Sequence, residues 1–510
     1  MIKQTTSKIL LTANCLALFS VLESTAQNTK PNILLILADD LGYGDVSALN
    51  ENSKIKTPAI DQLSKNGIRF TDAHSNSSVS TPSRYGILTG RYAFRTLLKQ
   101  SVLNGFSEPL IAPERSTLAS MLSKEGYITA CIGKWHLGWE WAKKENCDEI
   151  DYSRPISNGP VTRGFDYFFG IASSLDMPPY VYVERDTPTA IPNRISKESK
   201  GLTLFRSGPQ APDFEPEDCL PNFTQRAVEY ITNRKGDNKS FFLYLPLTAP
   251  HTPILPSKEF EGKSGLSSYA DFVMMVDDAV GKIISALKAS GQYQNTIIVF
   301  TSDNGCYRGA GMDDMEKQGH HSSYIYRGAK SDIFDGGHRI PLIISWGDKY
   351  NNRIEKGLIS LTDFYATFAQ MTGYKPVDNE GEDSHSFWPV LSCEGKPSRT
   401  DVVHHSIDGS FSLREGDWKL IFCPGSGGWS YPSLPKDKDF IATLPGMQLY
   451  DIKKDPGETN NLINKYPATV EKLKRKMQDY ILNGRSTPGR KQNNEISGKW
   501  KQIENVIQNY

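Results

Sequence analysis

The stretch that most constrains this sequence is STPSRYGILTGR, residues 80–91. It indicates a loop that runs into a helix, because Thr81 is a good N-cap and Pro82 suits the first helical turn. Ser80 then lies just before a helix N-terminus, where unpaired N–H groups and the helix dipole favour an anion. Arg84, one turn further on, adds a fixed guanidinium on the same side. These features predict an oxyanion site that contains a hydroxyl group, although a plain capped helix with a surface arginine has the same pattern.

The overall composition is that of a large globular chain without a dominant charge. The sequence has 510 residues, of which 38% are hydrophobic and 10% aromatic, enough for a sizeable core. Lysine and arginine total 58, as do aspartate and glutamate, so the formal net charge is zero. No net field therefore favours nucleic acid or an anionic membrane, and any anion site must be local.

Residues 1–26 have the features of a signal peptide. Lys3 and Lys8 form a basic start, and the apolar run 9–22 that follows is too short and interrupted to span a bilayer. Small residues at 24–26 provide a cleavage site. We therefore expect an exported protein, periplasmic or secreted, and no later stretch is apolar enough to be a transmembrane segment.

The cysteines show no CxxC spacing, so a structural zinc site is not indicated. In an oxidising compartment one or two disulfides are possible, but their pairing cannot be read from the sequence. After the signal peptide the cysteines are Cys131, Cys147, Cys219, Cys306, Cys393 and Cys423.

Two apolar runs end in carboxylate and amide side chains. Residues 32–38 and 296–301 are typical of strands buried on both faces of a parallel α/β sheet. Ligands of such sheets bind at the carboxyl ends of the strands, where buried carboxylates need a neutralising partner. Oxygen ligands from two strand ends suit a hard cation such as Ca²⁺, although each group alone is more simply a solvated turn. The four candidate ligands are Asp39, Asp40, Asp303 and Asn304.

Further cationic and imidazole groups follow other predicted strands. A strand over 127–132 leads to Lys134 and His136, which point the same way if the strand continues. Such a pair suits an oxyanion and a proton relay. His251 lies in a proline-fenced turn after the apolar run 240–246, and Lys330 is one more cation that could face an anion. Singly, each of these residues is more often an ordinary surface group.

The remaining segments complete the predicted architecture. Residues 164–170 and 175–180 are aromatic and turn-rich, and we interpret them as loops that cover a pocket, with Asp176 as a candidate substrate contact. Beyond about residue 390, short alternating segments predict a small antiparallel sheet, followed by an amphipathic helix with Val470, Leu473, Met477 and Tyr480 on one face. Residues 485–510 are polar and are expected to form a loosely packed tail.

The string at 80–91 resembles the signature of the type I sulfatases: Cys or Ser, any residue, Pro, Ser, Arg, three residues, then Leu-Thr-Gly. The strand ends, GKWHLG at 133–138, PHTP at 250–253 and SDNG at 302–305 match further family elements in the family's order. The resemblance implies an alkaline-phosphatase-like α/β sandwich with a large, mostly parallel mixed sheet and a smaller C-terminal α+β subdomain. The implied division is a signal peptide (1–26), a catalytic domain (27–390), the C-terminal subdomain (391–484) and the tail (485–510).

The resemblance also implies a chemistry. Ser80 would be oxidised to formylglycine by a radical-type maturase before export, as in serine-type bacterial members, and its hydrate would attack sulfur. Asp39, Asp40, Asp303 and Asn304 would bind one Ca²⁺, which also touches Ser80. The remaining roles fall to the cations Lys134, Arg84 and Lys330 around the sulfuryl oxygens, to His251 as proton donor to the leaving alcohol, and to His136 as partner of the hydrate.

The implied substrate is a sulfated carbohydrate attacked from a chain end, with galactose sulfate and N-acetylgalactosamine sulfate as the candidates. His404, His405 and Asp176 are candidate sugar contacts. Two alternatives remain: a phosphatase or phosphodiesterase of the same superfamily that uses unmodified Ser80, and a non-catalytic glycan-binding descendant. Asn304 stands where a two-zinc phosphatase would have a histidine, and no expected site residue is missing, so the sequence favours the sulfatase.

Overall fold

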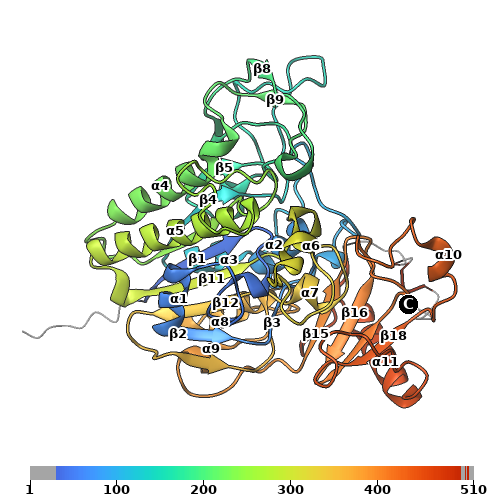
Figure 1. The fold of residues 1–510 in the computed structure, drawn as a ribbon. Helices are drawn as coiled ribbons and strands as arrows, with labels where there is room; N and C mark the ends of the chain where they lie inside the picture. Colours follow the sequence, from blue (N-terminus) through green and yellow to red (C-terminus); the bar gives the residue numbers. More distant parts are fainter. Residues whose placement is uncertain (1–29, 496–499, 501, 505–510) are drawn as a thin grey trace, which may run out of the picture.

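Figure 1 shows the fold in a computed structural model of the chain. The expected signal peptide, residues 1–26, lies outside the part that the structure describes. In that part, no helix has the length and apolar character needed to cross a membrane. The described residues are 30–495, 500 and 502–504.

A ten-stranded mixed sheet forms the centre of the molecule, in the order β13-β2-β12-β11-β1-β10-β4-β5-β6-β7. The middle strand, β1 (Asn32–Ala38), is parallel to both neighbours, so that Leu34 lies opposite Leu243 on one side and Ile298 on the other. All seven residues of β1 are buried, as the continuous apolar run predicts. The other strands are β2 (Gly67–Phe70), β4 (Ile128–Lys134), β5 (Tyr167–Ile171), β6 (Val183–Glu184), β7 (Thr187–Pro188), β10 (Phe241–Pro246), β11 (Thr296–Ser302), β12 (Leu342–Trp346) and β13 (Arg353–Glu355).

Helices cover both faces of this sheet, because alternate side chains of each buried strand point to opposite sides. Leu34 and Ile36 belong to the apolar cluster under one set of helices, and Ile33, Leu35 and Leu37 belong to the cluster under the other. The first set is α1 (Pro58–Lys65), α4 (Cys219–Thr232) and α5 (Ser268–Ala289). The second set is α2 (Ser80–Thr89), α3 (Leu118–Lys124) and α8 (Phe364–Thr372). Shorter helices are α6 (Met312–Lys317), α7 (Asp335–His338), α9 (Trp388–Leu391) and α10 (Lys438–Ile441).

A separate four-stranded antiparallel sheet follows in the chain, and it lies beside the main sheet in Figure 1. Helix α11 (Pro467–Leu482) packs on it through Val470, Leu473 and Met477, the face that the sequence predicts. Tyr92 and Phe94 of the first part of the chain enter the same apolar cluster, which joins the two parts. The strands are β15 (Asp401–His405), β16 (Phe411–Glu415), β17 (Trp418–Ile421) and β18 (Gln448–Asp451). Together the two sheets confirm the predicted fold class. Two-stranded sheets pair β3 (Ala73–His74) with β14 (Ile359–Ser360) and β8 (Arg194–Ile195) with β9 (Pro209–Gln210).

One segment that we expected to be a loop is a strand of the main sheet. Residues 164–170 contain most of β5, which pairs in parallel with β4. The prediction was wrong because it gave weight to the flanking glycines and overlooked the short apolar run between them. Position 170 requires glycine, because a Cβ atom there would lie 1.8 Å from the carbonyl oxygen of Gly133 on the neighbouring strand.

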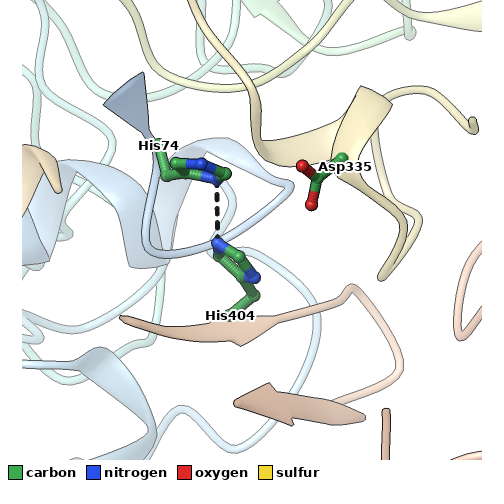
Figure 2. Close-up of side chains that lie close together, drawn as sticks. All are labelled: His74, Asp335 and His404. Atoms are coloured by element: carbon green, nitrogen blue, oxygen red, sulfur yellow. Dashed lines mark hydrogen bonds between the residues drawn. The ribbon is translucent and has the colours of Figure 1, made fainter. Parts of the chain in front are cut away.

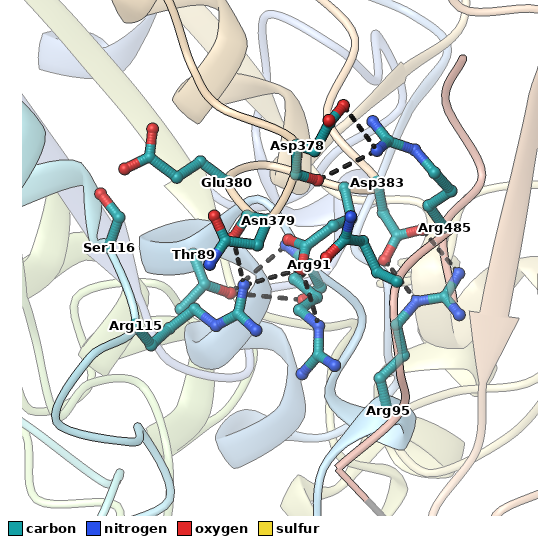
Figure 3. A network of polar contacts seen from close by, with 12 residues as sticks. Thr89, Arg91, Arg95, Arg115, Ser116, Asp378, Asn379, Glu380, Asp383 and Arg485 are labelled. Atoms are coloured by element: carbon teal, nitrogen blue, oxygen red, sulfur yellow. Dashed lines mark hydrogen bonds and ion pairs between the residues drawn. The ribbon is translucent and has the colours of Figure 1, made fainter. Parts of the chain in front are cut away.

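The described part of the tail is packed, contrary to expectation. Residues 485–495 run back over the first part of the chain. Arg485 donates a hydrogen bond to the carbonyl oxygen of Asp378 (3.0 Å), and the N–H of Ser486 donates to the buried carboxylate of Asp383 (2.9 Å). Figure 3 shows the surrounding network of arginines and carboxylates. A polar composition suggested solvent exposure, but here the polar groups are partners of buried charges.

The cysteines from Cys131 to Cys423 are all free thiols, four of them buried and two exposed. None of the possible disulfides is formed among these residues.

Candidate active site

The carboxylate and amide side chains after β1 and β11 meet at one edge of the main sheet. Ala38 and Ser302 are paired in register, so the residues that follow them are neighbours. The N–H of Asp303 donates to the carbonyl of Ala38 (3.2 Å), and the N–H of Asp40 donates to the Asp303 carboxylate (3.2 Å). Asp40 adopts a left-handed backbone conformation (φ 66°), which turns the chain at this point. The four predicted ligands Asp39, Asp40, Asp303 and Asn304 are all buried.

Ser80 is the first residue of α2, and its hydroxyl faces the same edge. Its Oγ donates to the Asp39 carboxylate (3.2 Å). The expected cap is absent, because Val79 is the N-cap residue and the Thr81 hydroxyl instead accepts a hydrogen bond from the N–H of Leu103 (3.1 Å). The helix therefore begins two residues earlier than predicted, so that Ser80 itself is the first helical residue. The hydroxyl and the unpaired N–H groups remain on the side of the carboxylates.

Three cations neutralise the three carboxylates. Lys134 Nζ lies 2.7 Å from Asp39, Lys330 Nζ lies 2.7 Å from Asp40, and an Arg84 amino group lies 2.9 Å from Asp303. All six side chains have little or no exposed surface. Such burial is tolerated only because each charge has a partner.

These pairs shift the pKa values of the groups. Burial alone would raise the pKa of Asp39, but the attraction of Lys134, His251 and Arg84 outweighs it and lowers that pKa to about 2. Burial also lowers the pKa of Lys134, and Asp39 offsets this only in part. For Lys330 the balance is reversed, since the nearby carboxylates overcome desolvation and raise the pKa of its ammonium group.

His136 is positioned by a backbone conformation that the sequence does not predict. Lys134 and His136 would point the same way only if the strand continued, but β4 ends at Lys134 and His136 has a left-handed backbone (φ 57°). Its Nε2 lies 2.8 Å from the carbonyl oxygen of Leu103, which can only accept, so Nε2 carries the hydrogen. Its Nδ1 is buried and has no hydrogen-bond partner among the described residues. Burial, and then the charges of Lys134 and Arg84, hold the pKa of His136 well below its usual value. The ring is thus a neutral base with a free lone pair.

A pocket of about 450 Å³ opens over these groups. Ser80, His136, His251 and Lys330 all line it, and His251 Nε2 lies 3.7 Å from the Asp40 carboxylate. The pocket thus brings together a hydroxyl, two imidazoles and an ammonium group. Its upper wall comes from segments far apart in the chain, among them Leu103, Asn104, Ser174, Asp176, Arg206, Tyr307, Ile407 and Trp429.

Only one of the three predicted sugar contacts lies in this pocket. Asp176 lines it and forms a short ion pair with Arg206, which the sequence analysis did not identify. His404 and His405 are buried in β15 instead, and His405 packs against the rings of Phe94 and Phe411. Neither histidine is among the residues that line the pocket. The two histidines therefore have structural positions rather than the predicted sugar contact.

His404 takes part in a polar cluster between β15 and β3, shown in Figure 2. His74 Nε2 lies 2.9 Å from the Asp72 carboxylate and 3.0 Å from an amino group of Arg414, and His74 Nδ1 lies 3.0 Å from His404 Nε2. Asp335 lies beside the two rings, in an arrangement that could hold a metal ion. However, the two facing ring nitrogens bind each other, and the Asp335 carboxylate is paired with Lys419 (2.8 Å). The cluster is thus explained as a buried link between the two parts of the chain.

The residues at the sheet edge fit a hard cation better than this cluster does. The Oδ1 atom of Asn304 is buried and has no hydrogen-bond partner among the described residues. An unpaired buried carbonyl beside three carboxylates has the oxygen chemistry that Ca²⁺ prefers. The donor set of Asp39, Asp40, Asp303 and Asn304 therefore suits one such ion.

Comparison with known proteins agrees with this geometry. A family model described as Sulfatase matches residues 31–374. The chain is 32% identical over 494 residues to an N-acetylgalactosamine-6-O-sulfatase of Bacteroides thetaiotaomicron, which covers 89% of this chain and 94% of that protein. It is 30% identical over 466 residues to arylsulfatase A of Homo sapiens, with 89% and 87% covered. A solved structure from work on glycosaminoglycan metabolism by Bacteroides thetaiotaomicron superimposes with a TM-score of 0.78 at 30% identity, covering 88% of this chain and 99% of that one.

The fold and the site thus define a sulfuric ester hydrolase built on a large mixed α/β sheet. The chain belongs to the sulfatase family.

Proposed function

We propose that this sulfatase removes a sulfate group from a sugar at the end of a glycan chain, with N-acetylgalactosamine 6-sulfate or the galactose equivalent as substrate. The observation that carries the proposal is the position of Ser80, whose hydroxyl lies between a carboxylate and the Lys134 ammonium at a helix N-terminus. The similarity to an N-acetylgalactosamine-6-O-sulfatase over nearly the whole chain supports the choice of sugar.

The proposal includes the family's cofactor chemistry. Ser80 is the residue to be oxidised to formylglycine by a radical-type maturase before export, and the hydrated aldehyde provides the nucleophilic hydroxyl. Asp39, Asp40, Asp303 and Asn304 are the residues that hold Ca²⁺, which when bound supplies a Lewis acid for a sulfate oxygen.

The remaining roles follow from the positions of the side chains. Positive charge is presented to the sulfate oxygens from fixed, buried positions by Lys134, Arg84 and Lys330. Negative charge that develops on these oxygens in the transition state is therefore stabilised without reorganisation of the side chains. His251 lines the pocket and donates a proton to the departing sugar oxygen. His136, neutral and with Nδ1 as acceptor, takes the proton that must leave the nucleophile before sulfate is released.

Sugar recognition falls to the pocket wall. Asp176 has almost no exposed surface, and its carboxylate is oriented by Arg206, which is about half exposed. A carboxylate and a guanidinium held together provide both an acceptor and donors for the hydroxyl groups of one sugar ring. We therefore assign these two residues to the sulfated sugar.

The experiment is sulfate release by a Ser80→Cys variant produced in a host that oxidises the cysteine-type motif. The panel contains sulfated monosaccharides and their phosphorylated counterparts, and Ser80→Ala is the control. Release of sulfate from the 6-sulfated sugar, without release of phosphate, is the expected result. Phosphate release that is undiminished in the unmodified wild-type protein would overturn the proposal in favour of a serine phosphatase. Formylglycine without any turnover would favour a larger or different substrate, or the non-catalytic glycan-binding alternative.

A further inference from the structure

Trp429 is a large apolar side chain that remains half exposed at the mouth of the pocket. It comes from the loop between β17 and α10, in the C-terminal part of the chain, yet it lines the same pocket as Ser80 and Lys330. Its exposed fraction is 51%, whereas most large aromatic side chains of this protein are buried. A half-exposed indole group beside a binding pocket is typical of a surface that binds a ligand.

The backbone of this loop is fixed to the segment that carries Lys330. The Asp332 carboxylate accepts hydrogen bonds from the N–H groups of Trp429 and Ser430, each 3.0 Å long. Its second oxygen accepts from the N–H of Ala329 (2.9 Å). The buried Asp332 carboxylate, together with the Ser331 hydroxyl that also accepts from the N–H of Trp429 (3.0 Å), therefore fixes the position of Trp429 relative to Lys330.

The indole ring is also oriented. The ring of Tyr307 packs against it edge to face, with centroids 5.6 Å apart and an angle of 76° between the planes. Lys330 Nζ lies 5.8 Å from the centre of the Tyr307 ring, so the three side chains form a continuous row from the cation outward. The ring is held on one side and open on another, as expected of a stacking surface.

We propose that Trp429 forms a subsite for the sugar next to the sulfated one, whose C–H face stacks on the indole ring. This inference rests on the proposed function, because it takes Lys330 and Ser80 to mark the sulfate end of the pocket. The occupant is a neighbouring sugar because Trp429 lines the same pocket as Ser80 and Lys330, so the sugar next to the sulfated one lies within reach of the exposed indole ring.

The test compares two substrates that differ by one sugar: 6-O-sulfated N-acetylgalactosamine, and a disaccharide with that residue at its non-reducing end. The quantity is the ratio of kcat/KM for the disaccharide to kcat/KM for the monosaccharide. Trp429→Ala is expected to lower this ratio at least ~5-fold, mainly through KM for the disaccharide, as for the loss of one stacking contact. Trp429→Phe keeps an aromatic face and should restore most of the ratio.

Tyr431→Ala is the matched control, since Tyr431 lies two residues away, is 65% exposed and does not line the pocket. It should leave the ratio unchanged. A ratio within about 2-fold of wild type in Trp429→Ala would overturn the subsite, whether both substrates slow equally or neither does.

Failure of the proposed function can be distinguished from failure of the proposed subsite. If wild type releases no sulfate from either sugar, binding of the disaccharide is measured by saturation-transfer NMR on Ser80→Ala, with and without Trp429→Ala. Loss of binding in the double variant supports the subsite, and equal binding, or no binding to either, overturns it.

Discussion

Lys134 and Asp39 form a fully buried ion pair, with Nζ 2.7 Å from the carboxylate, and the same ammonium group lies 3.3 Å from Ser80 Oγ. One cation thus faces both a proposed metal ligand and the proposed site of modification. It approaches from the end of β4, and the carboxylate approaches from the end of β1.

The first prediction concerns this ammonium group. Lys134→Met keeps most of the length of the side chain and removes the charge that we assign to a sulfate oxygen. We expect kcat for sulfate release to fall about 10²–10³-fold, the usual effect of removing one preorganised donor. Lys317→Met is the control, because Lys317 is exposed and pairs only with exposed Asp314. A kcat within a few-fold of wild type would contradict the assignment.

The second prediction concerns the metal. Addition of Ca²⁺ to chelator-treated protein should raise its melting temperature, because an ion that binds only the folded state stabilises it by about 2.7 kcal/mol at 100 times the dissociation constant. Asn304→Leu, which removes the unpaired carbonyl oxygen, should weaken the effect. The control is Asp314→Asn, a change in an exposed carboxylate outside the site. A melting temperature that does not respond to Ca²⁺ would exclude this donor set as a calcium site.

The sequence was sufficient for the parts of the site that follow regular strands. Asp39 and Asp303 come directly after apolar runs, and the carboxyl ends of parallel strands meet at one edge, so their approach could be expected. His136 could be named from its motif, but its left-handed backbone could not, and its tautomer depends on the carbonyl oxygen of Leu103 in a distant loop.

The pocket wall was beyond prediction for a different reason. Arg206 and Trp429 lie in irregular segments without periodicity, and their positions are set by contacts with residues remote in the chain. His404 and His405 were misjudged because a pair of histidines in a short strand gives no sign of burial. Only the register of β15 against β16 places them inside.

The third prediction is acid sensitivity of the fold through His405. Burial beside the rings of Phe94 and Phe411 lowers the pKa of His405 to about 4, against 6.5 for an exposed histidine. Between pH 6.5 and 4 the unfolded chain therefore binds a proton that the folded chain does not, so stability falls as the pH falls through this window. The contribution is about 3 kcal/mol when fully developed.

His405→Phe removes this titration and should lose less stability than wild type between pH 7 and pH 4, as measured by urea unfolding at each pH. His321→Phe is the control, because His321 is exposed and should leave the pH dependence unchanged. Parallel pH profiles for wild type and His405→Phe would show that His405 is protonated in the folded protein.

The last prediction concerns the network of Figure 3. The buried Asp383 carboxylate binds Arg95 through two hydrogen bonds of 2.8 Å and accepts two more from the N–H groups of Tyr92 and Ser486. Asp383→Asn leaves the Arg95 charge buried without a counter-ion, which costs about 3–5 kcal/mol. The midpoint of urea unfolding should fall accordingly.

Asp378→Asn is the matched control in the same network. Its side chain is 44% exposed and lies 3.6 Å or more from the charged groups of Arg485 and Arg490, so its removal should cost less than about 1 kcal/mol. Equal shifts of the urea midpoint in the two variants would mean that the network stabilises the fold through its total charge and not through the buried Asp383–Arg95 pair. A large shift for Asp383→Asn alone means that residues 485–495 are held by one desolvated ion pair, because Ser486 binds the same carboxylate as Arg95.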